Sequence, residues 1–245
     1  MSKLRTTLNR NLAFRGYRIV RTHNPNFFEL FLLRYLEGHG RTLRFIQIGA
    51  NDGQRFDPIH EFASSPHFEF FGLAVEPVPR FYRALKQIYR NQPGIKAVNA
   101  AIHNTWSEAT LYVVGEQFDR DVPEWALGTA SFSKEHVIKP EVPEEYIEAI
   151  TVPCVSLVGL MDREGFRKLD LLQIDTEGYD GEILRSIDFT KMRPAMIHFE
   201  HGMGDGVMTR SEVESLIELL NQQGYQVLLE RYDALAFLPY EFARN

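Results

Sequence analysis

Residues Phe45-Ile46-Gln47-Ile48-Gly49-Ala50-Asn51-Asp52-Gly53 are the most informative segment of this 245-residue chain. The apolar run over 43–48 predicts a buried β-strand, and a glycine-bearing turn follows it directly. Glycine lets the backbone approach a ligand closely, although a tight Asn-Asp-Gly turn without a ligand fits the same residues. The turn is neither a Gly-x-Gly-x-x-Gly dinucleotide loop nor a phosphate loop ending in Lys-Ser/Thr, which argues against a pyrophosphate ligand.

Apolar runs and helical patterns alternate along the rest of the chain, as they do in parallel α/β sheets. The predicted strands are 43–48, 70–75, 95–101, 170–174 and 195–199, and the predicted helices are 57–62, 80–90, 181–187 and a segment between Thr209 and Gly224. Thr209 and Glu212 predict a capping box. Two last apolar runs, 226–229 and 235–238, predict a hairpin. The fold class is α/β with a Rossmann-like, mostly parallel sheet and a C-terminal antiparallel hairpin.

The chain divides into two predicted parts. Residues 1–42 form a basic N-terminal arm and an apolar helix at 27–36, and residues 43–245 form the main domain. Segment 110–114 predicts an extra strand, and the acidic, irregular stretch 115–150 predicts an insertion over a cleft, since long connections are often lids. The basic arm is interpreted as solvated or docking rather than membrane- or nucleic-acid-binding; its cations are Lys3, Arg5, Arg10, Arg15, Arg18 and Arg21.

Composition limits the function classes. A net charge of −6 disfavours broad nucleic-acid binding. Cys154 is the single cysteine, which excludes an intrachain disulfide and a cysteine zinc cluster and favours a reducing, cytoplasmic location. No apolar run is long enough to span a bilayer, and no secretory signal is visible. The apolar helix 27–36 is a candidate homodimer interface.

Polar or small residues follow every predicted parallel strand, at the sheet edge where open α/β folds bind ligands. Glu76 could accept hydrogen bonds from a ribose diol, or it could be a surface residue that favours a helix start. The acids of 175–180 repel one another unless a cation or proton lies between them, although Asp180 also suits a helix start. Glu200 and His201 suit a base or a metal-ligand pair, although a lone histidine is usually structural.

Four segments, in matching order over 43–202, resemble the FkbM family of methyltransferases. They are the 45–53 turn, Val75-Glu76-Pro77 with Phe81, Val98-Asn99-Ala100-Ala101-Ile102, and Leu169 to Gly178 around Asp175-Thr176-Glu177. The chain departs from the usual family pattern at Gln173, Thr176 and Tyr179-Asp180. Four ordered motifs are far more specific than any one of them.

The resemblance implies a seven-stranded methyltransferase sheet in 43–245, S-adenosylmethionine as methyl donor, and transfer to a hydroxyl of a small-molecule acceptor, a sugar or secondary metabolite. The cofactor-binding candidates are Gln47, Gly49, Ala50, Asn51, Asp52, Glu76, Asn99, Ala100 and Asp175. The catalytic candidates are Asp175, Glu200 and His201, and the usual pKa of histidine makes His201 the best base. A divalent cation on Asp175 and Glu200 is not favoured, although carboxylate oxygens suit Mg²⁺.

Two other function classes stay open at this stage. The first is a non-catalytic scaffold that binds S-adenosylmethionine, which the basic arm and the altered Tyr179-Asp180 would fit. The second is a nicotinamide-dependent oxidoreductase, which predicts a complete dinucleotide glycine loop that the sequence lacks.

Overall fold

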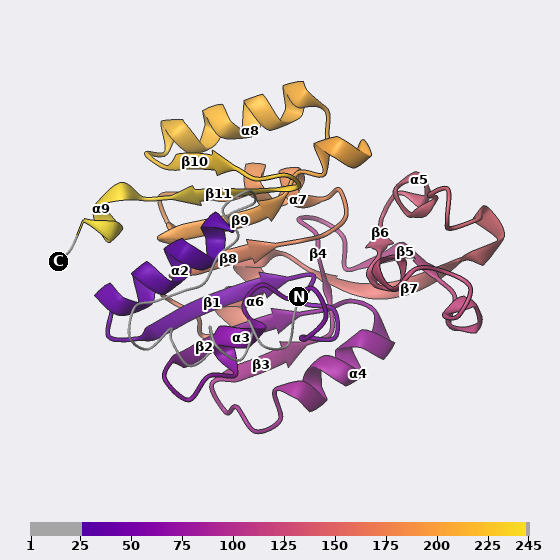
Figure 1. Ribbon diagram of the computed structural model, residues 1–245, viewed down its shortest axis with the longest axis horizontal. Coiled ribbons are helices and arrows are strands. Elements are labelled where there is room, and N and C mark those ends of the chain that lie inside the picture. The colour runs from indigo at the N-terminus through magenta and orange to yellow at the C-terminus, as the bar shows by residue number, and fades with distance from the viewer. Residues whose placement is uncertain (1–25, 244–245) are drawn as a thin grey trace.

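A seven-stranded sheet forms the centre of the protein, in the order β10-β11-β9-β8-β1-β2-β3 (Figure 1). The computed structural model describes residues 26–243, so the basic arm lies outside the described residues. Neighbouring strands are parallel except that β11 runs antiparallel to β9 and β10. The strands are β1 (Thr42–Ile48), β2 (Glu69–Val75), β3 (Ile95–Val98), β8 (Leu171–Ile174), β9 (Met196–Glu200), β10 (Gln226–Leu229) and β11 (Asp233–Phe237). The predicted α/β class and the terminal hairpin are confirmed.

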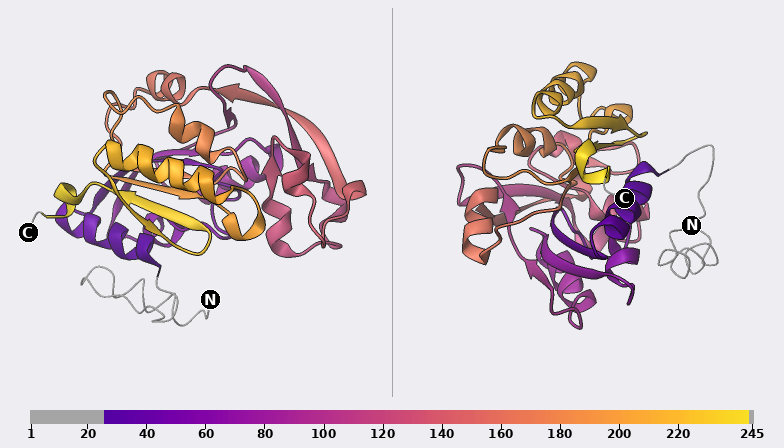
Figure 2. Two further views of the ribbon diagram at one scale, coloured as in Figure 1. Left: turned by 90° about the horizontal axis from the view of Figure 1, so that it is seen from above. Right: turned by 90° about the vertical axis from the view of Figure 1, so that its left-hand side faces the viewer.

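Helices cover both faces of this sheet (Figure 2). One core contains residues of α2 (Phe27–Gly38), α3 (His60–Ala63) and α4 (Pro79–Ile88). The other contains residues of α6 (Leu157–Glu164), α7 (Asp180–Arg185) and α8 (Arg210–Gln222). The short α9 (Pro239–Phe242) lies beside α2. Alternating residues of the buried strands supply both cores, which explains their nearly continuous apolar sequence.

The apolar face of α2 is buried within its own chain. Asn26 caps the helix by accepting a hydrogen bond from the Glu29 N–H. Phe28 and Leu32 are fully buried in the core that also holds Phe45 and Leu235. The residues that suggested an interface between two copies are therefore used to cover the sheet.

The predicted third strand, 95–101, is divided in the structure. The chain leaves the main sheet after β3, and β4 (Ala101–Ile102) pairs instead with β7 (Ile147–Val155). The Asn99 amide donates at 2.9 Å to the carbonyl oxygens of Glu76 and Pro77, which holds the break in place. Hydrophobicity alone could not show this change of partner.

A second, four-stranded sheet has the order β4-β7-β5-β6 and projects beyond the carboxyl ends of the main strands (Figure 1). The predicted extra strand is β5 (Glu108–Val114), which pairs antiparallel with β7. The segment predicted as irregular holds several short elements, listed here in order: η2 (Glu116–Phe118), η3 (Glu124–Gly128), β6 (Ala130–Ser131), α5 (Lys134–Val137) and η4 (Glu144–Tyr146). A further 3-10 turn, η5 (Met203–Asp205), lies after β9.

Local sequence signals explain the ends of α6 and α8. The capping box of Thr209 and Glu212 is present at the start of α8, as predicted. Ser156 caps α6 and Gly165 ends it in the left-handed conformation, a signal that was available in the sequence but not used. Among residues 26–243, no helix is both long and apolar enough to cross a membrane.

Candidate functional site

A cavity of about 1360 Å³ lies at the carboxyl edge of the main sheet. Its walls come from the 49–51 turn, Glu76, segment 100–102, segment 175–177, and Glu200. Trp125 and residues 128–130 also line it, so the insertion over 115–150, called the inserted unit below, borders the cavity. The topology therefore brings together the strand ends that the sequence singled out, as expected for a parallel sheet.

Gly49 is required by its contact with the next strand end. It has a φ of 79°, and a Cβ at this position would overlap the carbonyl oxygen of Asp175. The Gly49 and Ala50 N–H groups both donate to Val75 O at 3.0 Å, and the Asn51 N–H donates to Glu76 Oε2 at 2.8 Å. These N–H groups are thus engaged within the protein. Gly49, Ala50 and Asn51 all line the cavity, so the turn can let a ligand approach the backbone closely, while these three N–H groups already donate within the protein.

Glu76 is a buried carboxylate that faces the cavity. Its Oε1 accepts from the Val78 N–H at 2.8 Å, and only 4% of the residue is exposed. Burial raises the pKa of Glu76 to about 7, while the hydrogen bonds from Val78 and Asn51 oppose that rise. Each carboxylate oxygen still has a free lone pair, so Glu76 can accept from a diol.

Three predicted site residues do not line the cavity. The Asp52 carboxylate accepts from Gln54 N at 2.9 Å and from Arg55 N at 2.8 Å, which stabilises the turn. Asn99 braces Glu76 from behind, and neighbouring Ala100 supplies the cavity wall. Their contribution to a site is therefore indirect.

His201, the predicted base, is also turned away from the cavity lining. It is 1% exposed, and its Nδ1 accepts from the Met203 N–H at 3.2 Å. Burial lowers the pKa of His201, so the ring is neutral at physiological pH. A buried ring that does not reach the cavity is poorly placed to remove a proton from an acceptor.

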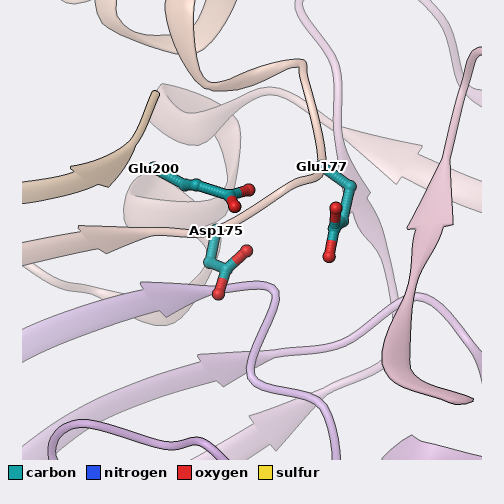
Figure 3. Close-up of side chains that lie close together, drawn as sticks. All are labelled: Asp175, Glu177 and Glu200. Carbon is teal, nitrogen blue, oxygen red and sulfur yellow. The ribbon is translucent and has the colours of Figure 1, made fainter. Parts of the chain in front are cut away.

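Asp175, Glu177 and Glu200 converge at the sheet edge (Figure 3). One carboxylate oxygen from each lies within 4.8 Å of the others. Burial raises the pKa of Glu200 to about 10, and the charges of Asp175 and Glu177 add to that rise. Burial, then Asp180, raises the pKa of Glu177 to about 7. Such spacing suits either a shared proton or a hard divalent cation, which these three oxygens could hold.

The carboxylate of Asp175 is exposed to the cavity yet surrounded by other acids. The surrounding protein still encloses this carboxylate within the cavity, and this desolvation, followed by the charges of Glu177 and Asp180, raises the pKa of Asp175 well above its usual value. Asp180 has a different role, because its carboxylate accepts from the N–H groups of Thr176 and Glu200 and is fully buried. Asp180 thus fixes the strand ends that carry the other acids.

Three polar side chains lie side by side within the main sheet, one or two residues before the carboxyl ends of their strands. Gln47, Gln173 and His198 are in register on β1, β8 and β9, and all three line the cavity. His198 Nδ1 and Gln173 Oε1 are 2.7 Å apart, and burial lowers the pKa of His198 to about 3. Gln47 Oε1 is buried and has no hydrogen-bond partner among residues 26–243. Only Gln47 of this row was among the predicted site residues.

Two sets of hydrogen bonds attach the inserted unit to the main domain. Arg80 of α4 donates to the carbonyl oxygens of Val114 and Leu127 at 3.1 and 3.2 Å and pairs with Asp119 at 2.9 Å. At the other end, Ser131 Oγ donates to Glu177 O at 2.8 Å. Specific hydrogen bonds therefore attach this unit to α4 and to the 175–177 segment beside the cavity.

The sequence profile described as "Methyltransferase FkbM domain" matches residues 47–227. The chain belongs to this family. It is accordingly an S-adenosylmethionine-dependent methyltransferase with the Rossmann-like sheet described above. The matched range begins in the 45–53 segment and ends within β10, so it includes the carboxyl ends of β1, β2, β3, β8 and β9 but not Glu230, Tyr232 and Asp233, which also line the cavity.

Solved structures of other methyltransferases are similar to this FkbM-type chain in fold. The METTL16 methyltransferase domain is 13% identical, with 97% of this chain and 82% of that chain covered at a TM-score of 0.48. A putative caffeoyl-CoA O-methyltransferase from Staphylococcus aureus is 12% identical, with 95% and 91% covered at a TM-score of 0.46. No curated protein matches the sequence. At such low identities, the acceptors of these proteins say nothing about the acceptor of this one.

Proposed function

We propose that this FkbM-type methyltransferase transfers the methyl group of S-adenosylmethionine to a hydroxyl of a small sugar or secondary metabolite. The observation that carries the proposal is the arrangement of carboxylates around the turn at 49–53. Glu76, which is suited to a ribose diol, lines the cavity on one side of this turn. Asp175 and Glu200 line the cavity on the other side. A nucleoside held between them would have its sulfonium beside the acids.

The residues fit the cofactor without any phosphate-binding feature. Glu76 would hold the ribose, Gly49 and Ala50 would give the methionine part a close passage, and Ala100 with Ile102 would border the adenine. Gln47 Oε1 is an unsatisfied buried acceptor that a donor on the ligand would satisfy. Bound S-adenosylmethionine supplies an activated methyl group, so positioning at near-attack distance contributes most of the acceleration.

Glu200 is the base in this proposal, and Asp175 orients the acceptor hydroxyl. The acceptor O–H proton passes to a Glu200 oxygen as the O–CH₃ bond forms, and the electron pair of the breaking C–S bond stays on sulfur. Glu200 Oε2 is buried and has no hydrogen-bond partner within the described part of the chain. The raised pKa keeps Glu200 protonated in the free protein at neutral pH, and the positive sulfonium of the bound cofactor would favour the ionised form that accepts the proton. Such a base contributes roughly two to four orders of magnitude in rate.

Two measurements test this function. Calorimetric titration should show that S-adenosylhomocysteine binds the wild-type protein, and that Glu76→Gln weakens this binding by about tenfold or more. Transfer of labelled methyl groups to a panel of hydroxylated sugars and metabolites should then identify an acceptor, and Glu200→Gln should lower turnover by about two orders of magnitude or more. Cofactor binding without transfer to any acceptor would favour the scaffold hypothesis instead.

A further inference from the structure

The acids at the sheet edge belong to a larger polar patch. Asp233 of β11 lies directly opposite Glu200 of β9, so both side chains are on the same face of the sheet. His198, two residues before Glu200, is on that face as well. The patch therefore continues from the row of Gln47, Gln173 and His198 to Asp233.

The whole cavity is strongly acidic. Two cationic side chains of the described residues line it, Arg55 and Lys139, against eleven carboxylates: Glu29, Asp57, Glu61, Glu76, Glu141, Asp175, Glu177, Glu200, Asp205, Glu230 and Asp233. Several of these acids have raised pKa values and share protons at neutral pH. S-adenosylmethionine has a sulfonium, an ammonium and a carboxylate and brings a net charge of about +1, so the acids that stay ionised favour a further cationic group in the cavity. Buried carboxylates need a partner.

Some of these acids are already engaged within the protein. Glu76 and Asp57 accept backbone hydrogen bonds, and Glu230 Oε1 accepts from Phe27 N at 2.6 Å and Phe28 N at 3.1 Å. Asp233 differs, because no ion pair or side-chain hydrogen bond of its carboxylate occurs between residues 26 and 243. Burial, then the charge of Glu230, raises the pKa of Asp233 to about 7. Its carboxylate lines the cavity and is available to a ligand.

A second feature of the cavity also calls for a hydrogen-bond donor. Gln47 is 3% exposed, and its Oε1 is the buried acceptor without a hydrogen-bond partner described above. It lines the cavity two residues before Gly49. Gln47 cannot turn its amide without consequence, because it also makes a side-chain hydrogen bond to Asp57. The patch thus presents acceptors to the cavity at both its ends.

We propose that the acceptor of this methyltransferase is a hydroxylated amine, whose protonated amino group binds Asp233 while its hydroxyl lies at Glu200. This inference rests on the proposed function and names the acceptor class. A protonated amine has no lone pair, so the nucleophile is the hydroxyl oxygen. The hydroxyl proton passes to Glu200, the O–CH₃ bond forms, the C–S bond breaks toward sulfur, and the ammonium is left unchanged.

The experiment compares a tetramer of glucosamine with the same tetramer fully N-acetylated, which has the same rings without the charge. Titration into the protein saturated with S-adenosylhomocysteine should show the amine form binding about tenfold tighter. Asp233→Asn should abolish that preference and retain cofactor binding. Glu218→Gln, which removes an exposed acid of α8 distant from the cavity lining, should leave the preference unchanged.

Several outcomes would overturn the inference. Equal binding of the two tetramers to the wild-type protein would do so, whatever the variant shows. Retention of the amine preference in Asp233→Asn would also overturn it, as would Mg²⁺ binding in place of the amine. If S-adenosylhomocysteine itself does not bind, the proposed function fails first. If cofactor binds and a neutral acceptor is methylated equally well, only the present inference fails.

Discussion

Gly49 lies so close to Asp175 that a side chain on Gly49 would overlap the Asp175 carbonyl oxygen. This contact joins the end of β1 to the end of β8, and Asp175 N in turn donates to Ile48 O at 3.0 Å. Two motifs that are 126 residues apart in the chain are thereby fixed as one wall of the cavity. The position of Asp175 relative to the turn at 49–53 therefore depends on the absence of a Cβ at Gly49.

Gly49→Ala should consequently damage both the fold and the site. The φ of 79° adds about 1–3 kcal/mol of backbone strain for alanine, before the overlap with Asp175 is counted. Urea unfolding should show at least this loss, and S-adenosylhomocysteine affinity should fall by about tenfold or more. Gly38→Ala is the matched control, since an added Cβ there meets no atom within 4 Å. Equal behaviour of the two variants would contradict the account.

Cofactor affinity should depend on pH through Glu76. Its pKa is raised to about 7 by burial, and a ribose diol donates to the ionised form. Affinity should therefore rise as pH increases toward 7 and level off above it. Glu177 and Asp233 also titrate near 7, so the informative quantity is the difference between wild type and Glu76→Gln. Identical pH profiles by calorimetry would exclude Glu76 as the group responsible.

The protein without cofactor should lose stability as pH rises. Burial and neighbouring acids raise the pKa of Glu200 to about 10 from 4.5, so the folded state holds this proton more tightly than the unfolded chain. Stability from this group is complete below pH 4.5 and is lost as pH rises toward 10. Glu200→Gln should raise the melting temperature by a few degrees at mildly alkaline pH. A variant that melts below the wild type under these conditions would count against repulsion among the acids.

Arg80 should control the mobility of the inserted unit. Arg80→Ala removes its hydrogen bonds to Val114 and Leu127 and its ion pair with Asp119. Hydrogen exchange over 116–128 should become faster by roughly tenfold, because opening of this unit costs less. Arg83→Ala, an exposed residue of the same helix, should leave exchange in this region unchanged. Unaltered exchange in Arg80→Ala would show that the unit is held by other contacts.

Periodic and glycine-bearing segments of the sequence predicted the central fold well. The strand at 43–48, its turn, the α8 capping box and the C-terminal hairpin all follow from local chemistry, and each is present. The predicted 57–62 helix was displaced, since Asp57 accepts from the N–H groups of Ile59 and His60 and α3 begins only at His60. β7 was missed because its burial is irregular and Pro153 interrupts it.

The site was predicted only in part, for reasons of topology. Asp175 and Glu200 line the cavity and could be selected from the sequence because each stands at the end of a parallel strand. Asp233 also lines the cavity, but it begins an antiparallel strand that reaches the same edge from the opposite direction, so it was not among the candidates. His201 was overvalued because sequence gives the usual pKa of a histidine, while its burial and direction depend on tertiary structure.

A crystal structure with S-adenosylhomocysteine bound would show where the nucleoside lies. Both ribose hydroxyls should be within hydrogen-bonding distance of the Glu76 carboxylate, and the sulfur should face the space between Asp175 and Glu200. A nucleoside bound elsewhere on the protein, or bound in this cavity with its ribose away from Glu76, would rule out the proposed cofactor site.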